Sequence, residues 1–387
     1  MIRKNSLATD FVSFARERYG LEGSIPLHAP RFTKDDKRYV SDAIDSTYVS
    51  SVGQFVDEFE EEIARFTGAR YVVATSTGTS ALHVALLVAG VLENDEVITP
   101  TLTFVATCNA VKYCGGFPVF VDVERETLGL SPIALGEFLS TTAEVLENGL
   151  CRNRQTGRVI RMCLPVNNLG HPARIKEINN ICAEYNIGVI EDAAESLGSF
   201  AGGKHSGLGG IAGVLSFNGN KIITTGGGGA IITNHKYIAA RAKHLSTTAK
   251  KAHAWEFEHD DVGFNYRMPN INAALGCAQM LKIEEYLQSK RRLAQQYEEW
   301  FAARGVEFVS EPSDCRSNYW LNACLFESKE ERDDFLQITN TSNVQTRPLW
   351  KPMHSLPMFQ NCSGDELKVS KDVASRLACL PSSPSAI

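Results

Sequence analysis

The segment SFNGNKIITTGGGG contains Lys221, which follows a short apolar run and precedes four glycines at 226–229. A lysine amine captures a carbonyl group when it is held close to that carbonyl and its pKa is lowered. The glycines would let the backbone turn tightly and pass close to a ligand before the next strand. The pattern favours a lysine that binds a carbonyl cofactor. The alternative is a solvated loop lysine beside a flexible turn.

Two acidic residues, Asp192 and Glu195, follow another apolar run in GVIEDAAESLGS. In an open α/β sheet, ligands bind beyond the carboxyl ends of the strands, so Asp192 is well placed for a functional acid. A buried carboxylate there could pair with a protonated pyridine nitrogen and keep that ring a good electron sink. Because Asp followed three residues later by Glu is also a capping-box pattern, a helix N-cap is the alternative.

A strand, a Thr/Ser/Gly turn and a helix are predicted in VVATSTGTSALHVALLVAG. Backbone amides at the helix start, together with the hydroxyls of Thr79 and Ser80, would form an anion site. The GxxxxGK[ST] spacing of a P-loop is absent, which argues against a nucleotide triphosphate. Ordinary N-capping by Thr79 is the alternative, and His83 on the following helix has the pattern of a packed residue.

The segment GFNYRMPNINAALGCAQM places Asn265 and Arg267 before a helix rich in small residues. Arg267 could bind a carboxylate or phosphate with two parallel hydrogen bonds, and the alternative is a surface ion pair. The small residues would permit close helix packing within the fold or across a dimer. The histidines show no paired metal spacing, so we predict no metal site.

Seven β-rich runs alternate with helical patterns and would position these side chains. The runs are YVVA (71–74), EVIT (96–99), PVFVDV (118–123), VIRMCLPV (159–166), IGVIE (187–191), VLSF (214–217) and AIIT (230–233). This alternation predicts an α/β fold with a doubly wound, mostly parallel sheet of about seven strands.

Further elements are expected at both ends of the chain. Phe11, Phe14, Ala15 and Tyr19 have the spacing of a short helix packed on the main body, and one long helix is expected from about 270 to 304. We expect three parts: an N-terminal helical extension at 1–25, a large domain at 26–255, and a small α+β domain at 256–387 joined by the long helix.

The composition is that of an ordinary globular enzyme, with 43% hydrophobic and 22% charged residues. A formal charge of -6 provides no basic field, so a nucleic-acid partner is not expected. The ten cysteines are scattered without a CxxC pair. No apolar run has the length of a signal peptide or of the roughly 20-residue bilayer span. These features predict a cytoplasmic protein with reduced thiols and no membrane partner.

The order of the motifs is more specific than any one of them. In sequence, TGTSALH, TFVATCNAV, EDAAES, SFNGNK with its glycines, and GFNYRMPNINAA resemble the DegT/DnrJ/EryC1/StrS family of sugar aminotransferases over nearly the whole chain. The resemblance implies pyridoxal 5'-phosphate as the cofactor and the fold of the aspartate aminotransferase superfamily, fold type I. It also implies a homodimer with shared active sites.

The family's cofactor-binding positions correspond to residues of this chain. By resemblance, Lys221 is the Schiff-base lysine, Asp192 is the partner of the pyridine nitrogen, and Phe104 stacks on the ring. Glu195 lies beside the cofactor at a position where the family often has His or Gln. Positions that hold the phosphate correspond to Thr79, Ser80, Ser216 and, from the neighbouring subunit, Asn265.

The resemblance also implies the substrate. IPLHAPRF, STYVSSVGQFVDEFE and HAWEFEHDDVGFNYRMPNINAALG look most like the subgroup that aminates carbon 4 of UDP-4-keto-6-deoxy-N-acetylhexosamines, on pathways to bacillosamine and legionaminic acid. L-glutamate is the expected amino donor. Arg267 is expected to face the substrate, and His354 to lie at the substrate mouth or to cap the small domain.

Three other activities stay open. One is amination of another dTDP- or GDP-keto-sugar at carbon 3 or 4. The others are a pyridoxamine-phosphate-dependent sugar dehydratase and a non-catalytic regulator that binds pyridoxal phosphate. Dehydratases that resemble this family carry histidine at the lysine position, so Lys221 argues against the dehydratase.

Overall fold

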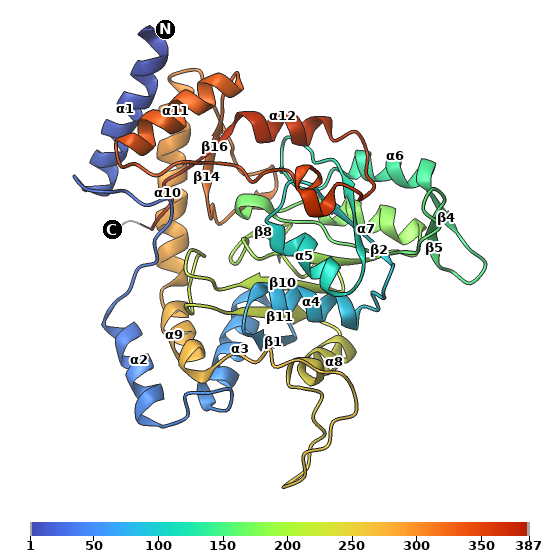
Figure 1. The fold of residues 1–387 in the computed structure, drawn as a ribbon. Coiled ribbons are helices and arrows are strands. Elements are labelled where there is room, and N and C mark those ends of the chain that lie inside the picture. Colours follow the sequence, from blue (N-terminus) through green and yellow to red (C-terminus); the bar gives the residue numbers. More distant parts are fainter. Residues whose placement is uncertain (1, 385–387) are drawn as a thin grey trace.

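The computed structural model describes residues 2–384, and a seven-stranded sheet forms its centre (Figure 1). The strand order is β1-β11-β10-β7-β6-β2-β3. β11 is antiparallel to both of its neighbours, and the remaining pairs are parallel. The predicted α/β fold with a mostly parallel sheet is therefore confirmed. The strands are β1 (Tyr71–Thr75), β2 (Glu96–Pro100), β3 (Phe117–Val121), β6 (Ile160–Cys163), β7 (Gly188–Asp192), β10 (Ala212–Ser216) and β11 (Gly229–Thr233).

Helices cover both faces of this sheet because successive strand residues point to opposite sides. Ile231 packs in the core formed with α4 and α8, whereas its neighbour Ile232 packs in the core on the other face. The middle residues of these strands are therefore mostly apolar, as expected for a sheet buried on both sides, and polar residues such as Glu96 and Asp192 lie at strand ends. The covering helices are α3 (Gln54–Thr67), α4 (Gly78–Val88), α5 (Val105–Tyr113), α6 (Pro132–Thr142), α7 (Ile175–Glu184) and α8 (Lys236–Ser246).

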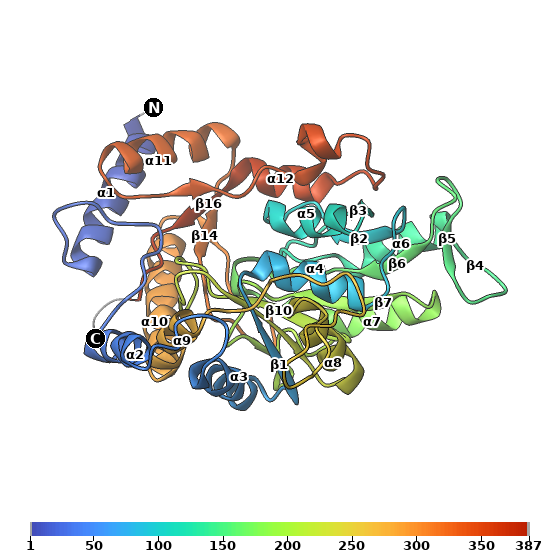
Figure 2. The ribbon, with the colours of Figure 1, turned by 60° about the horizontal axis from the view of Figure 1, so that its bottom comes forward.

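The C-terminal elements form a second, smaller layer, coloured orange to red in Figure 2. Its four-stranded sheet has the order β12-β14-β16-β15. Asp122, just beyond β3, accepts hydrogen bonds from the backbone N–H groups of Val369 and Ser370, both at 2.8 Å, and so joins the two layers. The elements are β12 (Glu307–Phe308), β14 (Asn322–Leu325), β15 (Arg347–Pro348), β16 (Leu377–Leu380), α11 (Lys329–Thr341) and α12 (Lys368–Arg376).

Short elements complete the described chain. They are α2 (Lys34–Asp45), β4 (Ala143–Val145), β5 (Cys151–Asn153), β8 (Phe200–Ala201), β9 (Lys204–His205), β13 (Cys315–Arg316) and the 3-10 turns Asn168–Gly170, Met353–Ser355 and Pro357–Phe359. The proposed domain limits at residues 25 and 255 stay a prediction.

The long helix expected from about 270 to 304 is two helices, α9 (Asn270–Met280) and α10 (Ile283–Ala302). Lys282, between them, has φ -121° and ψ 5° and leaves the helical conformation. Its Nζ lies 3.1 Å from Oδ2 of Asp36 in α2, which fixes the chain at the break. The expectation of one helix was wrong. The break was not foreseen because the sequence has neither Gly nor Pro at this position.

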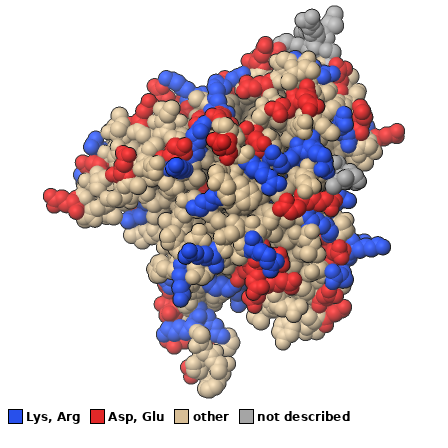
Figure 3. All heavy atoms as spheres, turned by 180° about the vertical axis from the view of Figure 1, so that it is seen from behind, with Lys and Arg blue, Asp and Glu red and all other residues tan. Residues whose placement is uncertain are grey.

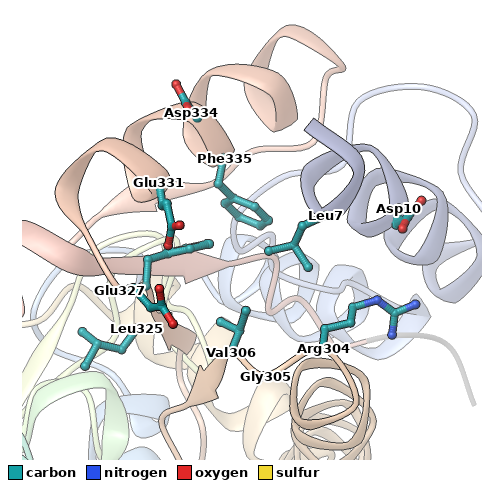
Figure 4. A pocket seen from close by; sticks show the side chains of 11 residues that line it. Leu7, Asp10, Arg304, Gly305, Val306, Leu325, Glu327, Glu331, Asp334 and Phe335 are labelled. Carbon is teal, nitrogen blue, oxygen red and sulfur yellow. The ribbon is translucent and has the colours of Figure 1, made fainter. Parts of the chain in front are cut away.

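The predicted N-terminal helix is confirmed as α1 (Ile2–Tyr19). Phe11 is fully buried, and its ring centroid lies 5.1 Å from that of Phe335 and 5.6 Å from that of Trp300. A cavity of about 520 Å³ lies between α1 and α11, where Leu7, Val306 and Phe335 point toward one another (Figure 4). This cavity shares no lining residue with the one that contains Lys221.

Acidic and basic side chains are interspersed over the face seen in Figure 3, which forms no single-sign field. None of the helices within residues 2–384 combines the length and the apolar character needed to cross a membrane.

Candidate active site

A cavity of about 280 Å³ lies beyond the carboxyl ends of β7 and β10. Both layers of the protein line it, because Trp320 and Trp350 of the C-terminal part complete its wall. Six of the predicted site residues meet there: Thr79, Phe104, Asp192, Glu195, Ser216 and Lys221. Sheet topology brings them together, since parallel strands end at the same edge.

Lys221 follows β10 in a tight turn, and its backbone N–H donates to the carbonyl of Asn218 at 3.0 Å. Its Nζ lies 3.7 Å from Oε1 of Glu195 and 3.9 Å from the centroid of the Trp320 ring, with 13% of the side chain exposed. Burial lowers the pKa of Lys221, although Glu195 and Asp192 act in the opposite direction. The solvated-loop alternative is therefore wrong, and the amine has the surroundings of a nucleophile or base.

Asp192 is the last residue of β7 and is 5% exposed. Its Oδ2 accepts a hydrogen bond from Oγ1 of Thr107 at 2.7 Å, and its Oδ1 accepts one from the backbone N–H of Ala194 at 3.2 Å. No helix begins directly after it, since the next helix of the described chain is α8 at Lys236, so the N-cap alternative is wrong. Burial raises the pKa of Asp192, and a protonated ring nitrogen beside it would stabilise the charged carboxylate.

Glu195 is also nearly buried, and its Oε2 accepts a hydrogen bond from the backbone N–H of Leu169 at 2.9 Å. Burial raises the pKa of Glu195 to about 7, and the charge of Lys221 opposes this increase. Burial therefore disfavours the charged form of both side chains, while each charge favours that of the other.

The start of α4 forms the polar end of the cavity. Thr77 is the N-cap, and the hydroxyl of Ser80 donates to the carbonyl of Thr77 at 2.8 Å while accepting from its N–H at 3.0 Å. The alternative of N-capping by Thr79 is therefore wrong. Ser80 faces this cap and is not among the residues that line the cavity, whereas Thr79 and Ser216 line it.

Close backbone approach shapes this end of the cavity. A Cβ added to Gly78 would lie 3.0 Å from Cβ of Ser216, and one added to Gly229 would lie 2.5 Å from the backbone N of Gly78. The absence of side chains lets the first turn of α4 lie directly against the strand ends. The N–H groups of this first turn and the hydroxyls of Thr79 and Ser216 are suited to bind a phosphate group.

Phe104 lies at the cavity wall with 54% of its surface exposed. It directly precedes α5, which carries Thr107 and so fixes Phe104 relative to Asp192. An exposed ring at a cavity wall is suited to stack on a flat aromatic group. A phosphate site, a carboxylate for a ring nitrogen, a stacking ring and an amine thus occur in one cavity, which fits pyridoxal phosphate.

Asn265, Arg267 and His354 lie outside this set. Nε of Arg267 donates to Oδ1 of Asn265 at 3.0 Å, on a segment that follows the loop projecting at the bottom of Figure 1. Nδ1 of His354 lies 2.8 Å from Oγ1 of Thr101, so His354 joins the C-terminal part to the end of β2. The packed position of His83 is confirmed, since its ring centroid lies 4.9 Å from that of Phe264.

Sequence reasoning missed Thr107, Trp320 and Trp350. Thr107 had a signal, because it lies in the motif TFVATCNAV, three residues after Phe104. Trp320 had none, since it lies 100 residues beyond Asn220, whose carbonyl accepts the indole N–H at 2.6 Å.

Comparison with known proteins agrees with this geometry. A model of the DegT/DnrJ/EryC1/StrS aminotransferase family matches residues 30–386. A putative pyridoxal phosphate-dependent aminotransferase, EpsN of Bacillus subtilis (strain 168), is 36% identical over 363 residues, covering 92% of this chain and 90% of EpsN. GDP-perosamine synthase of Escherichia coli O157:H7 is 35% identical over 361 residues, covering 93% and 94%.

Solved structures agree as well. A DegT DnrJ EryC1 StrS aminotransferase from Brucella abortus superposes with a TM-score of 0.82 at 25% identity over 90% of each chain. Helicobacter pylori PseC shares the fold, with a TM-score of 0.83 at 23% identity over 92% of this chain and 93% of PseC. The predicted type I fold and pyridoxal phosphate cofactor are thereby confirmed, and the chain belongs to the DegT/DnrJ/EryC1/StrS family of pyridoxal-phosphate-dependent aminotransferases.

Proposed function

We propose that this enzyme transfers the amino group of L-glutamate to the carbon-4 keto group of a nucleotide-linked 4-keto-6-deoxy sugar. The proposed substrate is UDP-4-keto-6-deoxy-N-acetylhexosamine. One observation carries the proposal: the amine of Lys221 lies in a single cavity with the carboxylates of Asp192 and Glu195. The substrate itself is supported by the motifs that resemble the UDP-sugar subgroup.

Different residues of the cavity hold different parts of the cofactor. When bound, pyridoxal phosphate supplies an electron sink for the charge left when a C–H bond is broken. Asp192 keeps the ring nitrogen protonated, Phe104 stacks on the ring, and Thr79 and Ser216 hold the phosphate at the start of α4. Ser80 acts indirectly, by fixing the turn that precedes Thr79.

Lys221 carries the proton movements. Lys221 would hold the cofactor covalently, and when its amine is free it would take a proton from the α-carbon of the donor. In the second half of the reaction Lys221 returns a proton to carbon 4 of the sugar, on the face that it occupies. Its partly buried position, with a lowered pKa, supports both steps.

A second copy of this chain completes the proposed site. Asn265 and Arg267 do not line the cavity of their own chain. The loop before them exposes Trp255 by 77% and Phe257 by 79%, as expected of a segment covered by a partner. We infer a homodimer in which Asn265 reaches the partner's phosphate site and Arg267 faces its substrate. His354 is proposed to act on the substrate only through the position of the C-terminal part.

A GDP-linked keto-sugar is the second candidate. Three relatives named GDP-perosamine synthase are 33% to 35% identical to this chain and cover 87% to 93% of it. The nucleotide is therefore best decided by comparing keto-sugars that carry different nucleotides.

The test is a substrate panel with the purified protein. L-glutamate is expected to bleach an absorption band at about 420 nm, and UDP-, GDP- and dTDP-keto-sugars are then added singly. The band is expected to return fastest with the UDP-sugar, with an aminated product in the mass spectrum. Return with the GDP-sugar alone would select the second candidate, and a deoxygenated product would select the dehydratase.

Lys221→Ala is expected to lose the band and all measurable amino transfer, because no other lysine lines the cavity. Lys204→Ala, a change at the exposed first residue of β9, is the matched control. Near-normal amino transfer by Lys221→Ala would disprove the role of Lys221.

A further inference from the structure

Trp320 lies directly against the amine of Lys221 and outside the five motifs of the sequence analysis. The Nζ atom lies 3.9 Å from the ring centroid, on the indole face, with Glu195 as the nearest carboxylate at 3.7 Å. A cation over an aromatic face is stabilised by the ring quadrupole, more strongly when water is excluded. Trp320 is only 4% exposed, so little of the contact is open to solvent.

Four contacts hold Trp320 in this orientation. The indole N–H donates to the carbonyl of Asn220, the residue before Lys221, at 2.6 Å. The ring is stacked on that of Trp350 with centroids 6.5 Å apart and an interplanar angle of 11°. The backbone N–H donates to Oδ1 of Asn318 at 2.7 Å, and the carbonyl accepts from Nζ of Lys290 at 3.1 Å. The ring face therefore has a fixed position relative to Lys221.

The fully buried Asn318 links Trp320 to the acid on the other side of the amine. Its Nδ2 donates to the carbonyl of Glu195 at 2.8 Å and to that of Leu197 at 2.9 Å. Asn318 therefore holds the backbone of both residues that contact the lysine amine, Trp320 and Glu195.

We propose that Trp320 is a positioning residue that holds the freed amine of Lys221 over its indole face, opposite Glu195, while Asn318 fixes the two together. The inference deepens the proposed function, because a lysine that leaves the cofactor needs a defined resting place from which to move protons. A residue of the small C-terminal layer thereby fixes the position of the Lys221 amine, which follows a strand of the large sheet.

The other titratable groups around the amine are few. Asp192 and Glu195 raise the pKa of Lys221, and burial lowers it. Burial, followed by the charges of Lys290 and Lys221, keeps the pKa of His28 well below its usual value. Burial also lowers the pKa of Lys290, whose Nζ donates to the carbonyls of Trp320 and Ser382. Removing the ring face of Trp320 therefore leaves Asp192 and Glu195 to hold the ammonium alone.

The test measures the amine itself in the ligand-free protein. Lys221 is labelled with a trace of an amine-reactive reagent across a pH series, and its peptide is quantified by mass spectrometry. Trp320→Leu keeps an apolar wall but loses the aromatic face, so the pKa of Lys221 is expected to fall by about 0.5 to 1 unit. Trp320→Phe keeps a ring and is expected to give a decrease less than half as large. Trp300→Phe, in the cluster beneath α1, is the control and is expected to leave this pKa unchanged.

A kinetic measurement separates positioning from simple packing. With glutamate, Trp320→Leu is expected to lose about 10- to 100-fold in kcat with a small change in KM, because the base is displaced while the donor site stays intact. An unchanged amine pKa in Trp320→Leu, with only a lower melting temperature, would overturn the proposal. If that variant does not fold, an unchanged pKa and kcat in Trp320→Phe would overturn it. Failure of the wild-type enzyme to transfer amino groups would instead overturn the proposed function, since the labelling needs no substrate.

Discussion

Replacement of Glu195 by Gln should make the ligand-free protein more stable at alkaline pH. The folded protein raises the pKa of Glu195 from 4.5 to about 7, chiefly by burial. The folded state therefore holds this proton more tightly than the unfolded chain. Stability from the group is fully present below about pH 4.5 and is lost as the pH rises through 7.

The size of the effect follows from that shift. A change from 4.5 to about 7 corresponds to about 3 kcal/mol in the free energy of unfolding. The side chain is 5% exposed, so solvent screens it little. Gln keeps an oxygen that can accept a hydrogen bond from the N–H of Leu169, and it carries no charge. The variant therefore does not lose unfolding free energy through ionisation at this position as the pH rises. Without Glu195, Lys221 also loses its proton more easily, which changes stability in the same direction.

The assay is urea unfolding of the ligand-free wild type and Glu195→Gln at about pH 5 and about pH 8.5. The difference in unfolding free energy, variant minus wild type, is expected to be about 3 kcal/mol more positive at the higher pH. Glu298→Gln, on the exposed face of α10, is the control and should show no such change. A difference that is the same at both pH values would refute the burial argument for Glu195.

Two other changes test the site and its support. Asp192→Asn keeps an acceptor for Thr107 but removes the charge, and kcat is expected to fall about 100- to 1,000-fold with the fold intact by circular dichroism; wild-type turnover would exclude the role of Asp192. Asp122→Ala leaves the N–H groups of Val369 and Ser370 unpaired at the start of α12, and unfolding in urea is expected to show a loss of about 2 to 4 kcal/mol. Asp122→Asn should lose clearly less, and an equal loss would contradict the hydrogen-bond argument.

The main sheet and the chemical core of the site were predictable from sequence. Most of the seven strands are short, largely apolar runs with helical patterns between them, and burial on both faces explains their apolar character. Asp192 directly ends one run, and Lys221 follows another after a few residues. Because parallel strands end at one edge, their sequence positions were enough to predict that they would meet.

Local competition between hydrogen bonds was not predictable in the same way. Thr77, Thr79 and Ser80 all have hydroxyls that can cap a helix, and only the backbone geometry decided that Thr77 is the cap and Ser80 its partner. The break between α9 and α10 depends likewise on a contact of Lys282 with Asp36 in a distant helix.

By itself the sequence determined the fold class and, through its resemblance to the family, the cofactor, because these depend on short segments with strong patterns. It also predicted that Lys221 and Asp192 would lie in one site, and both line the same cavity. Only the tertiary structure decided what surrounds the amine. Trp320 and Asn318 come from a segment about 100 residues beyond Lys221, joined to it by hydrogen bonds across the two layers. Such contacts depend on how the layers pack, and no local pattern of apolar or polar residues encodes that packing.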